Sequence, residues 1–326
     1  MSKRDLVLLA IDDASDVQRT MDVGLRAAKA READVHVVRV VPHGGLRLDD
    51  RLGRWAFARH DARREPIGAE LAAMVRAAKD DGVRVQSVTL QGEPTDVIPA
   101  YAQLHDATML VLAPDYGSSR FFRSARVVDE LARHLSIPVL VVPGRPRERN
   151  EAGPRRIVTP VDFSVASAVA MRTALDLARR DGGRVTLVHA LPEVPQHMVV
   201  SGSEALDLIR RLPARLEAVA GRLRRKAAFI GMDDVDTEVA TGFADTVILE
   251  TSTRSDADLV VMGITHRTWL DRVLFKSTLR RVLRRATVPV LAVPVVAGAH
   301  PWPNPAPVEQ VSGGLLEELA GHRVAA

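Results

Sequence analysis

Residues 6–15 read LVLLAIDDAS and residues 157–167 read IVTPVDFSVAS, so that Asp162 stands 150 positions after Asp12. The same spacing recurs in segment after segment along the chain, and a chance similarity would not keep it. The other matching segments are VHVVRVVP (35–42) with VTLVHALP (185–192), MLVLAP (109–114) with DLVVMGI (258–264), and IPVLVVP (137–143) with VPVLAVP (288–294), the last pair at a spacing of 151. The chain therefore contains one sequence unit twice.

Each copy alternates short apolar runs with longer amphipathic stretches. In the second copy, RIVTPVDF is followed by SVASAVAMRTALDLARRDG, where apolar residues recur at helical spacing up to Gly182 and Gly183. The strand runs are nearly continuous in valine and leucine, which predicts a sheet covered on both faces. Alternating strands and helices predict parallel pairing with right-handed crossovers. We therefore predict the α/β class, as two tandem doubly wound, Rossmann-like domains with about five parallel strands each.

The stretches between and after the copies set the domain boundaries. GRPRERNEAGPRR (144–156) is rich in proline, glycine and charge, as linkers are, and AGAHPWPNPAPVEQ (297–310) is proline-rich. We predict a first domain over 1–146, a second over 154–297 and a C-terminal tail over 298–326.

Composition excludes several classes of protein. The 326 residues include no cysteine, so disulfides, thiolate metal sites and thiol nucleophiles are absent. The apolar run near the start is interrupted by Asp12 and Asp13, too early for a signal core or a membrane span, which predicts a cytoplasmic protein without a membrane partner. The net charge is only +4, and RRVLRR (280–285) fits a cationic helix face without aromatic stacking residues. No nucleic-acid partner is expected.

Ligands of open parallel sheets bind beyond the carboxyl ends of the strands, where the strand order reverses. Asp162 follows the first strand of the second copy and can accept hydrogen bonds from a ligand. The alternative is that Asp162 or Ser164 caps the next helix by accepting backbone N–H bonds. Gly263 follows the fourth strand, where it either admits a ligand close to the backbone or serves a tight turn. Ser277 then precedes a helix whose first amides favour phosphate.

With the strand-one aspartate, the DLVVMG strand, the helix-opening serine and the closing PVLAVP strand, both copies resemble the universal stress protein domain, over about 4–143 and 155–296. Nucleotide-binding members of that family carry G-x2-G-x9-G-[ST] after strand four. Gly263 and Ser277 match this pattern, whereas His266 and Lys276 stand at its second and third glycines. In the first copy Ala113 replaces the first glycine, and the pattern is lost.

The resemblance implies an adenine nucleotide, ATP with or without Mg²⁺, bound chiefly in the second copy. His266 and Lys276 could contact phosphates as side-chain cations in place of the lost glycines, or they could form a solvated basic surface. The implied role is a regulatory or sensing module and not an enzyme, with at most slow incidental ATP hydrolysis. The implied binding residues are Pro160, Asp162, Val188, Met262, Gly263, His266, Lys276, Ser277 and Thr278.

One alternative to this function stays open on the sequence, a protein-interaction scaffold of the same fold in which both pockets are lost. An ATP pyrophosphatase or nucleotidyl transferase is disfavoured, because such an enzyme would carry Ser-Gly-Gly-x-Asp-Ser or His-x-Gly-His after strand one, where this chain has DDASD and DFSVAS. The apolar fifth strands would lie at sheet edges, so we expect them to pair within the chain, and the same edges allow a homodimer.

Overall fold

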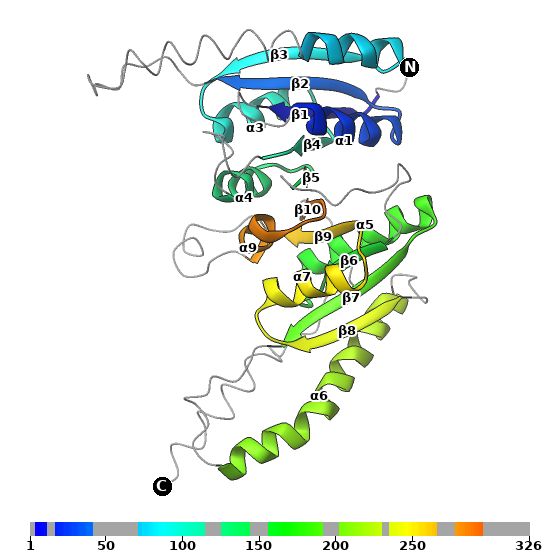
Figure 1. The fold of residues 1–326 in the computed structure, drawn as a ribbon, viewed down its shortest axis with the longest axis vertical. Coiled ribbons are helices and arrows are strands. Elements are labelled where there is room, and N and C mark those ends of the chain that lie inside the picture. The colour runs from blue at the N-terminus through cyan, green and yellow to red at the C-terminus, as the bar shows by residue number, and fades with distance from the viewer. Residues whose placement is uncertain are drawn as a thin grey trace, which may run out of the picture. The chain divides into compact units, whose positions relative to one another are not determined.

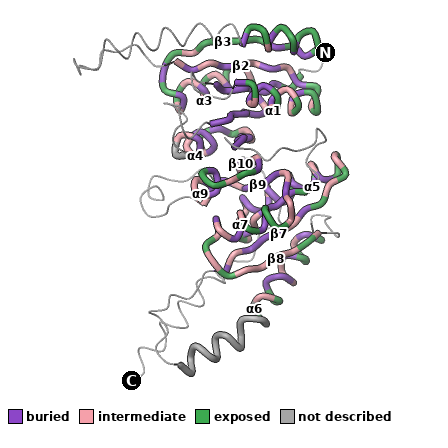
Figure 2. The backbone as a smooth tube through the Cα atoms, viewed as in Figure 1, coloured by how far each residue is buried: buried purple, intermediate pink, exposed green. Residues whose placement is uncertain are grey.

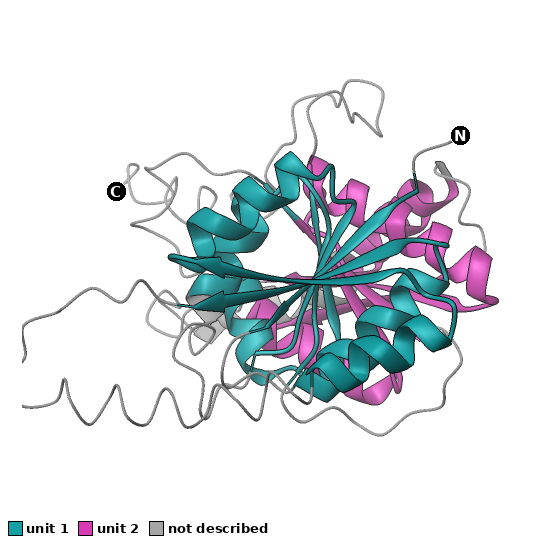
Figure 3. Ribbon diagram, turned by 90° about the horizontal axis from the view of Figure 1, so that it is seen from above, with its two compact units in different colours: residues 1–150, 264–294 teal, residues 151–263, 295–326 magenta. Residues whose placement is uncertain are grey.

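A computed structural model describes residues 4–11, 17–41, 71–114, 125–143, 156–191, 202–229, 235–265 and 278–295. The chain divides into two compact units, coloured separately in Figure 3. Unit 1 comprises residues 1–150 and 264–294, and unit 2 comprises residues 151–263 and 295–326. The last helix and strand of the second repeat are thus grouped with unit 1, which a division at the linker alone does not anticipate.

Unit 1 has a mainly parallel sheet in the order β3-β2-β1-β4-β5-β10 (Figure 1). The pairs from β3 to β5 are parallel, and β10 runs antiparallel to β5, with Leu291 opposite Leu140. The strands are β1 (Leu6–Ile11), β2 (Asp34–Val41), β3 (Val85–Gln91), β4 (Met109–Leu112), β5 (Val139–Val141) and β10 (Val290–Pro294).

The helices of unit 1 cover this sheet. Helix α1 packs on β1 and β4, while α3 packs on β2 and on α4. The basic segment 280–285 lies on an amphipathic helix, because Leu279, Val282 and Leu283 are buried on its other face. These helices are α1 (Val17–Lys29), α3 (Pro94–Leu104), α4 (Ala125–His134) and α9 (Thr278–Arg285), together with a helical segment over 71–80.

Unit 2 contains four parallel strands in the order β9-β6-β7-β8. They are β6 (Arg156–Pro160), β7 (Arg184–Leu191), β8 (Asp236–Thr241) and β9 (Leu259–Ile264), and the helices are α5 (Val165–Asp181), α6 (Gly202–Phe229) and α7 (Ala244–Arg254). Ser164 caps α5 by accepting the Ser167 N–H, and Gly182 ends it with φ 65°. Strands β6, β7 and β9 are mostly buried, as the continuous apolar runs predict, whereas the edge strand β8 is half-buried to exposed (Figure 2). The predicted α/β class with parallel, doubly wound sheets is confirmed.

The two repeats share backbone details as well as elements. Gly92 and Gly242, 150 positions apart, have φ of 144° and 140°, a conformation that side chains rarely allow. Each glycine N–H donates to the last residue of the second strand of its own repeat at 2.9 Å. Asp106 and Asp256 likewise have φ of 52° and 51°. The duplication read from the sequence is therefore repeated in the geometry of individual turns.

Two further observations concern the whole described part of the chain. None of its helices is long and apolar enough to cross a membrane. The predicted tail over 298–326 and nearly all of the predicted linker lie outside the described residues.

Candidate functional site

The strand order of unit 2 reverses at β6. From β6 the chain passes to β7 and then β8, and it returns to β9 on the other side of β6. In open parallel sheets such a reversal leaves a crevice outside the carboxyl ends of the two strands concerned. The segment after β6 and the end of β9 are therefore where a ligand site is expected in this unit.

Four of the predicted residues lie on the strands themselves, including Gly263, which is within β9 and not after it as the sequence predicts. Pro160 ends β6 and pairs in register with Val188 of β7. Val188 is buried, and its carbonyl oxygen already accepts the Val161 N–H at 2.8 Å. Met262, in β9, is buried as well. The strands thus use Val188 for sheet pairing and core packing, and leave the loop after β6 as the accessible part.

Asp162 opens that loop, and its side chain is exposed. The Ser164 N–H donates to Asp162 Oδ1 at 3.0 Å, which folds the loop into a turn held by an aspartate side chain. Ser164 itself is the cap of α5, since its hydroxyl oxygen accepts the Ser167 N–H at 3.2 Å. Of the two capping residues considered, the structure gives the cap to Ser164, and the exposed carboxylate of Asp162 can still meet a ligand.

Gly263 lies against the first turn of α5. A Cβ built at this position would stand 1.9 Å from the Ala166 carbonyl oxygen and 2.9 Å from the Ser167 nitrogen. Both are backbone atoms of a packed helix, so they cannot move aside easily. Packing against α5 is therefore sufficient to require glycine here, and the residue needs no ligand to explain it.

A cluster of side chains that the sequence did not single out as a site stands beside Asp162. Phe163 has φ 63°, a left-handed conformation that is unusual for a bulky residue. Its ring centroid is 5.1 Å from the ring centroid of His189, on β7. The guanidinium carbon of Arg222, on α6, lies 4.3 Å from the Phe163 ring centroid. Beside the aspartate, the ring of the next residue thus contacts an imidazole from β7 and a cation from α6.

His189 is buried, and its Nδ1 lies 2.6 Å from the Val161 carbonyl oxygen. A carbonyl only accepts, so Nδ1 carries the proton and donates. Burial lowers the pKa of His189, and Arg222 lowers it further, against the opposing effects of the Val161 hydrogen bond and Asp162. The imidazole is therefore neutral near pH 7 and lies beside the Phe163 ring, with the two ring planes tilted by 48°.

The remaining predicted residues belong to the segment between β9 and α9. His266, Lys276 and Ser277 lie outside the described residues. Thr278 is the first residue of α9, which is grouped with unit 1. In the first repeat, Asp12 is also outside the described residues, while Ala113 is buried after β4.

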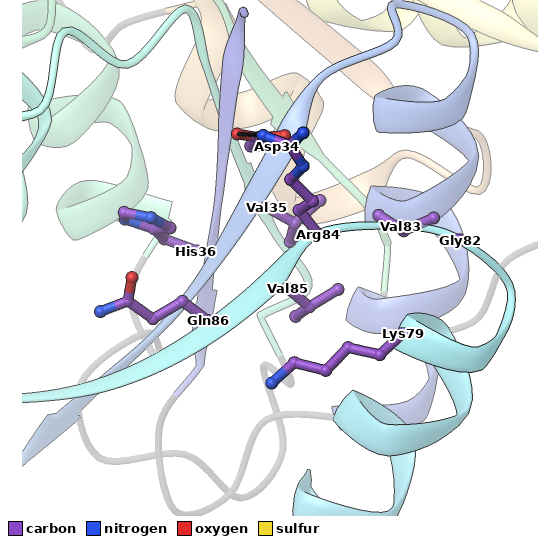
Figure 4. A pocket seen from close by; sticks show the side chains of 9 residues that line it. All are labelled: Asp34, Val35, His36, Lys79, Gly82, Val83, Arg84, Val85 and Gln86. Atoms are coloured by element: carbon purple, nitrogen blue, oxygen red, sulfur yellow. Dashed lines mark ion pairs between the residues drawn. The ribbon is translucent and has the colours of Figure 1, made fainter.

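A hollow of about 500 Å³ lies in unit 1 at the amino ends of β2 and β3 (Figure 4). Its carboxylate, Asp34, forms ion pairs with Arg84 at 4.0 Å and with Arg4 at 3.8 Å. Lys79 is exposed at its rim. The hollow opens at the end of the sheet away from the carboxyl ends of the strands. Nor does any group of three or more histidine, aspartate or glutamate side chains in the described residues form a candidate metal site.

Comparison with known proteins completes the description. The model of the universal stress protein family matches residues 3–143 and again residues 153–294. The chain belongs to this family. The two matches confirm the tandem universal stress protein domains that the sequence indicates.

Individual relatives agree with this membership. A universal stress protein of Methanocaldococcus jannaschii is 30% identical over 139 residues, covering 43% of this chain and 81% of that protein. A universal stress protein E homolog of Haemophilus influenzae is 28% identical over 172 residues, which cover 50% of this chain and 54% of that protein. A solved universal stress protein of Archaeoglobus fulgidus shares the fold, with a TM-score of 0.58, 17% identity and coverage of 89% of this chain and 96% of that one.

Proposed function

We propose that this universal stress protein binds an adenine nucleotide, ATP with or without Mg²⁺, mainly through its second repeat. The observation that carries the proposal is the exposed carboxylate of Asp162 at the reversal point of the unit 2 sheet. An exposed acceptor at that edge suits the hydroxyls or amine of an adenosine group. The proposed role is regulatory or sensing, in the cytoplasm, with at most slow incidental hydrolysis.

The phosphates belong, in this proposal, to the segment between β9 and α9. His266 and Lys276 replace two glycines of the family pattern, and their side chains supply positive charge where backbone amides would otherwise bind phosphate. Thr278 begins α9, where unpaired helix amides favour an anion, and Ser277 precedes it in the sequence. The proposal thus assigns the phosphates a site of cations and hydroxyls.

The first repeat is not assigned a nucleotide. Ala113 is buried where the pattern has its first glycine, and Pro114, which follows, has no backbone N–H to donate. The alanine methyl group narrows the approach to the backbone, and the proline removes a donor, at the position where phosphates would be bound.

Mass spectrometry of a denatured extract of the purified protein tests whether nucleotide is carried. A titration of thermal stability with ATP, with and without Mg²⁺, then gives the affinity, because a ligand at 100 times its Kd stabilises the folded state by about 2.7 kcal/mol. Lys276→Ala is expected to weaken ATP binding, while the exposed Lys79→Ala in unit 1 leaves it unchanged. Tighter binding by Lys276→Gly would show that the lysine obstructs the phosphates.

A protein-interaction scaffold is the second candidate, and the pairing of β5 with β10 favours it. These two strands close the two repeats, and they pair antiparallel in unit 1 through Val139–Val141. We propose that this pairing joins the two repeats as a pseudo-dimer within one chain, and that further association gives a homodimer. Sedimentation velocity of the full chain tests the second step. If the protein is monomeric at all concentrations and ATP does not raise its thermal stability, both the homodimer and ATP binding are excluded. The remaining candidate is then a monomeric scaffold.

A further inference from the structure

Phe163 has an unusual backbone for its side chain. With φ 63° it occupies the left-handed region, which glycine and asparagine adopt far more readily than phenylalanine. Conformations of this kind persist where surrounding contacts fix them, and they gather at ligand sites. The residue stands between the exposed Asp162 and the helix cap Ser164, at the carboxyl end of β6. Its position and its backbone conformation are both those expected of a residue at a ligand site.

Two planar groups hold that ring. The Arg222 guanidinium carbon is 4.3 Å from the ring centroid, and the imidazole of His189 is 5.1 Å away, tilted by 48°. No carboxylate among the described residues forms an ion pair with Arg222, although such partners are present for Arg224 and Arg254 elsewhere in the unit. A guanidinium without a carboxylate partner that rests on an aromatic face is suited to stack a second flat group.

We propose that Phe163 and Arg222 form the base-recognition end of the nucleotide site, on which the flat ring of a nucleobase stacks. The inference rests on the proposed nucleotide binding and names the part of the ligand that this cluster contacts. Stacking between a base and an aromatic or guanidinium plane needs no particular pattern of donors. The pair therefore holds the base in place, while Asp162 is left to contact polar groups beside it.

Three ligands separate the base from the phosphates: ATP, adenosine and inorganic tripolyphosphate. Their affinities are measured by isothermal titration calorimetry on the full chain and on Arg222→Met, which keeps an unbranched apolar stem and removes the charged guanidinium plane. Arg224→Met is the matched control, because Arg224 lies on the same helix, is exposed and pairs with Glu217. Phe163→Leu is the second variant, since it keeps an apolar side chain and removes the aromatic face.

We expect Arg222→Met and Phe163→Leu each to weaken the binding of ATP and of adenosine by the same factor. That factor should be between about five-fold and a hundred-fold, the usual range for one stacked base. Tripolyphosphate binding and the Arg224→Met control should stay unchanged. Equal weakening of tripolyphosphate by Arg222→Met would make Arg222 a phosphate contact and overturn the inference. Unchanged ATP and adenosine affinities in both variants would overturn it as well.

The same measurements separate this inference from the proposed function. If ATP does not bind the unchanged protein but adenosine binds and is weakened by Arg222→Met, ATP binding fails and the stacking pair stands. If ATP and tripolyphosphate bind equally and neither variant matters, the phosphate site stands and the stacking pair fails. If none of the three ligands binds, both are overturned.

Discussion

Corresponding positions of the two repeats carry different polar clusters on the same backbone. In the first repeat, the Tyr101 hydroxyl lies 2.9 Å from Nδ1 of His36, and the rings of Tyr101 and His105 are 4.2 Å apart. In the second repeat, Thr251 stands 150 positions after Tyr101, and its hydroxyl donates to Glu238 at 2.9 Å. An aromatic cluster between α3 and β2 thus corresponds to a charged one between α7 and β8.

The core shows a related exchange of volume. Leu9 of β1 faces Gly24 of α1, where a Cβ would come within 2.1 Å of the leucine Cδ2. The positions 150 residues later hold Thr159 and Ala174, both fully buried. A large and a very small side chain in one repeat are replaced by two of intermediate size in the other. The duplicated backbone therefore tolerates different side-chain sets as long as the total volume is kept.

The largest effect is expected at Gly263. Replacing it with alanine places a methyl group against the backbone of α5, so we expect Gly263→Ala to lower the free energy of unfolding by about 2–3 kcal/mol. The first repeat already has alanine at the corresponding position, and Ala113→Gly should cost about 1 kcal/mol. Urea denaturation of both variants gives the comparison. A loss below about 0.5 kcal/mol for Gly263→Ala would mean that α5 can shift away.

Gly24→Ala should destabilise the first repeat by about 1–2 kcal/mol, because the new methyl group meets the buried Leu9. Shortening the leucine restores room, so Leu9→Val combined with Gly24→Ala should be more stable than the two single effects added together. A double-mutant cycle by urea denaturation measures this coupling. The exposed Asp22→Ala on the same helix is the control. Simple additivity would show that the two positions do not share one space.

Acidification should destabilise both repeats through one histidine in each, the buried His189 and the half-buried His36. Burial lowers the pKa of His189 in the second repeat and of His36 in the first, where His105 lowers it further. The unfolded chain then binds more protons than the folded one as the pH falls below about 6.5, so stability present at pH 7.5 is lost towards pH 5.

The measurement is the midpoint of thermal unfolding between pH 5 and pH 8. His189→Gln should flatten the dependence more than His36→Gln, because His189 is the more deeply buried of the two. His134→Gln, at an exposed position, serves as the control. A variant of His189 with the same pH dependence as the unchanged protein would exclude it as a source of acid sensitivity.

Much of the fold follows from the sequence because it depends on periodicity and local signals. The apolar runs place the strands, and Gly182 and Ser164 mark the ends of α5 as the pattern predicts. The duplication is visible because 150-residue spacing relates whole segments. Family membership follows from those segments and is confirmed because the family model matches both repeats.

The candidate site was less accessible to such reasoning. Phe163 adopts a left-handed backbone at a position where the sequence offers no glycine or asparagine as a signal. Arg222 reaches it from a helix far along the chain, and such a contact has no local pattern. Gly263 resembled a ligand-loop glycine, although the nearness of Ala166 explains it by packing. Contacts between distant segments determine all three.

The smallest expected change in the free energy of unfolding is at two buried threonines of the second repeat. Thr159 Oγ1 is buried without a hydrogen-bond partner among the described residues, whereas Thr251 Oγ1 donates to Glu238. Valine has nearly the shape of threonine, so Thr159→Val removes an unsatisfied hydroxyl and should stabilise the protein by about 0.5–1 kcal/mol. Thr251→Val removes a satisfied one and should cost about 1 kcal/mol. Opposite shifts of the urea midpoint would show that the hydroxyl at position 159, where the first repeat has leucine, does not stabilise the fold. They would also show that the polar contact of Thr251 does. Shifts in the same direction would mean that Thr159 has a hydrogen-bond partner in solution.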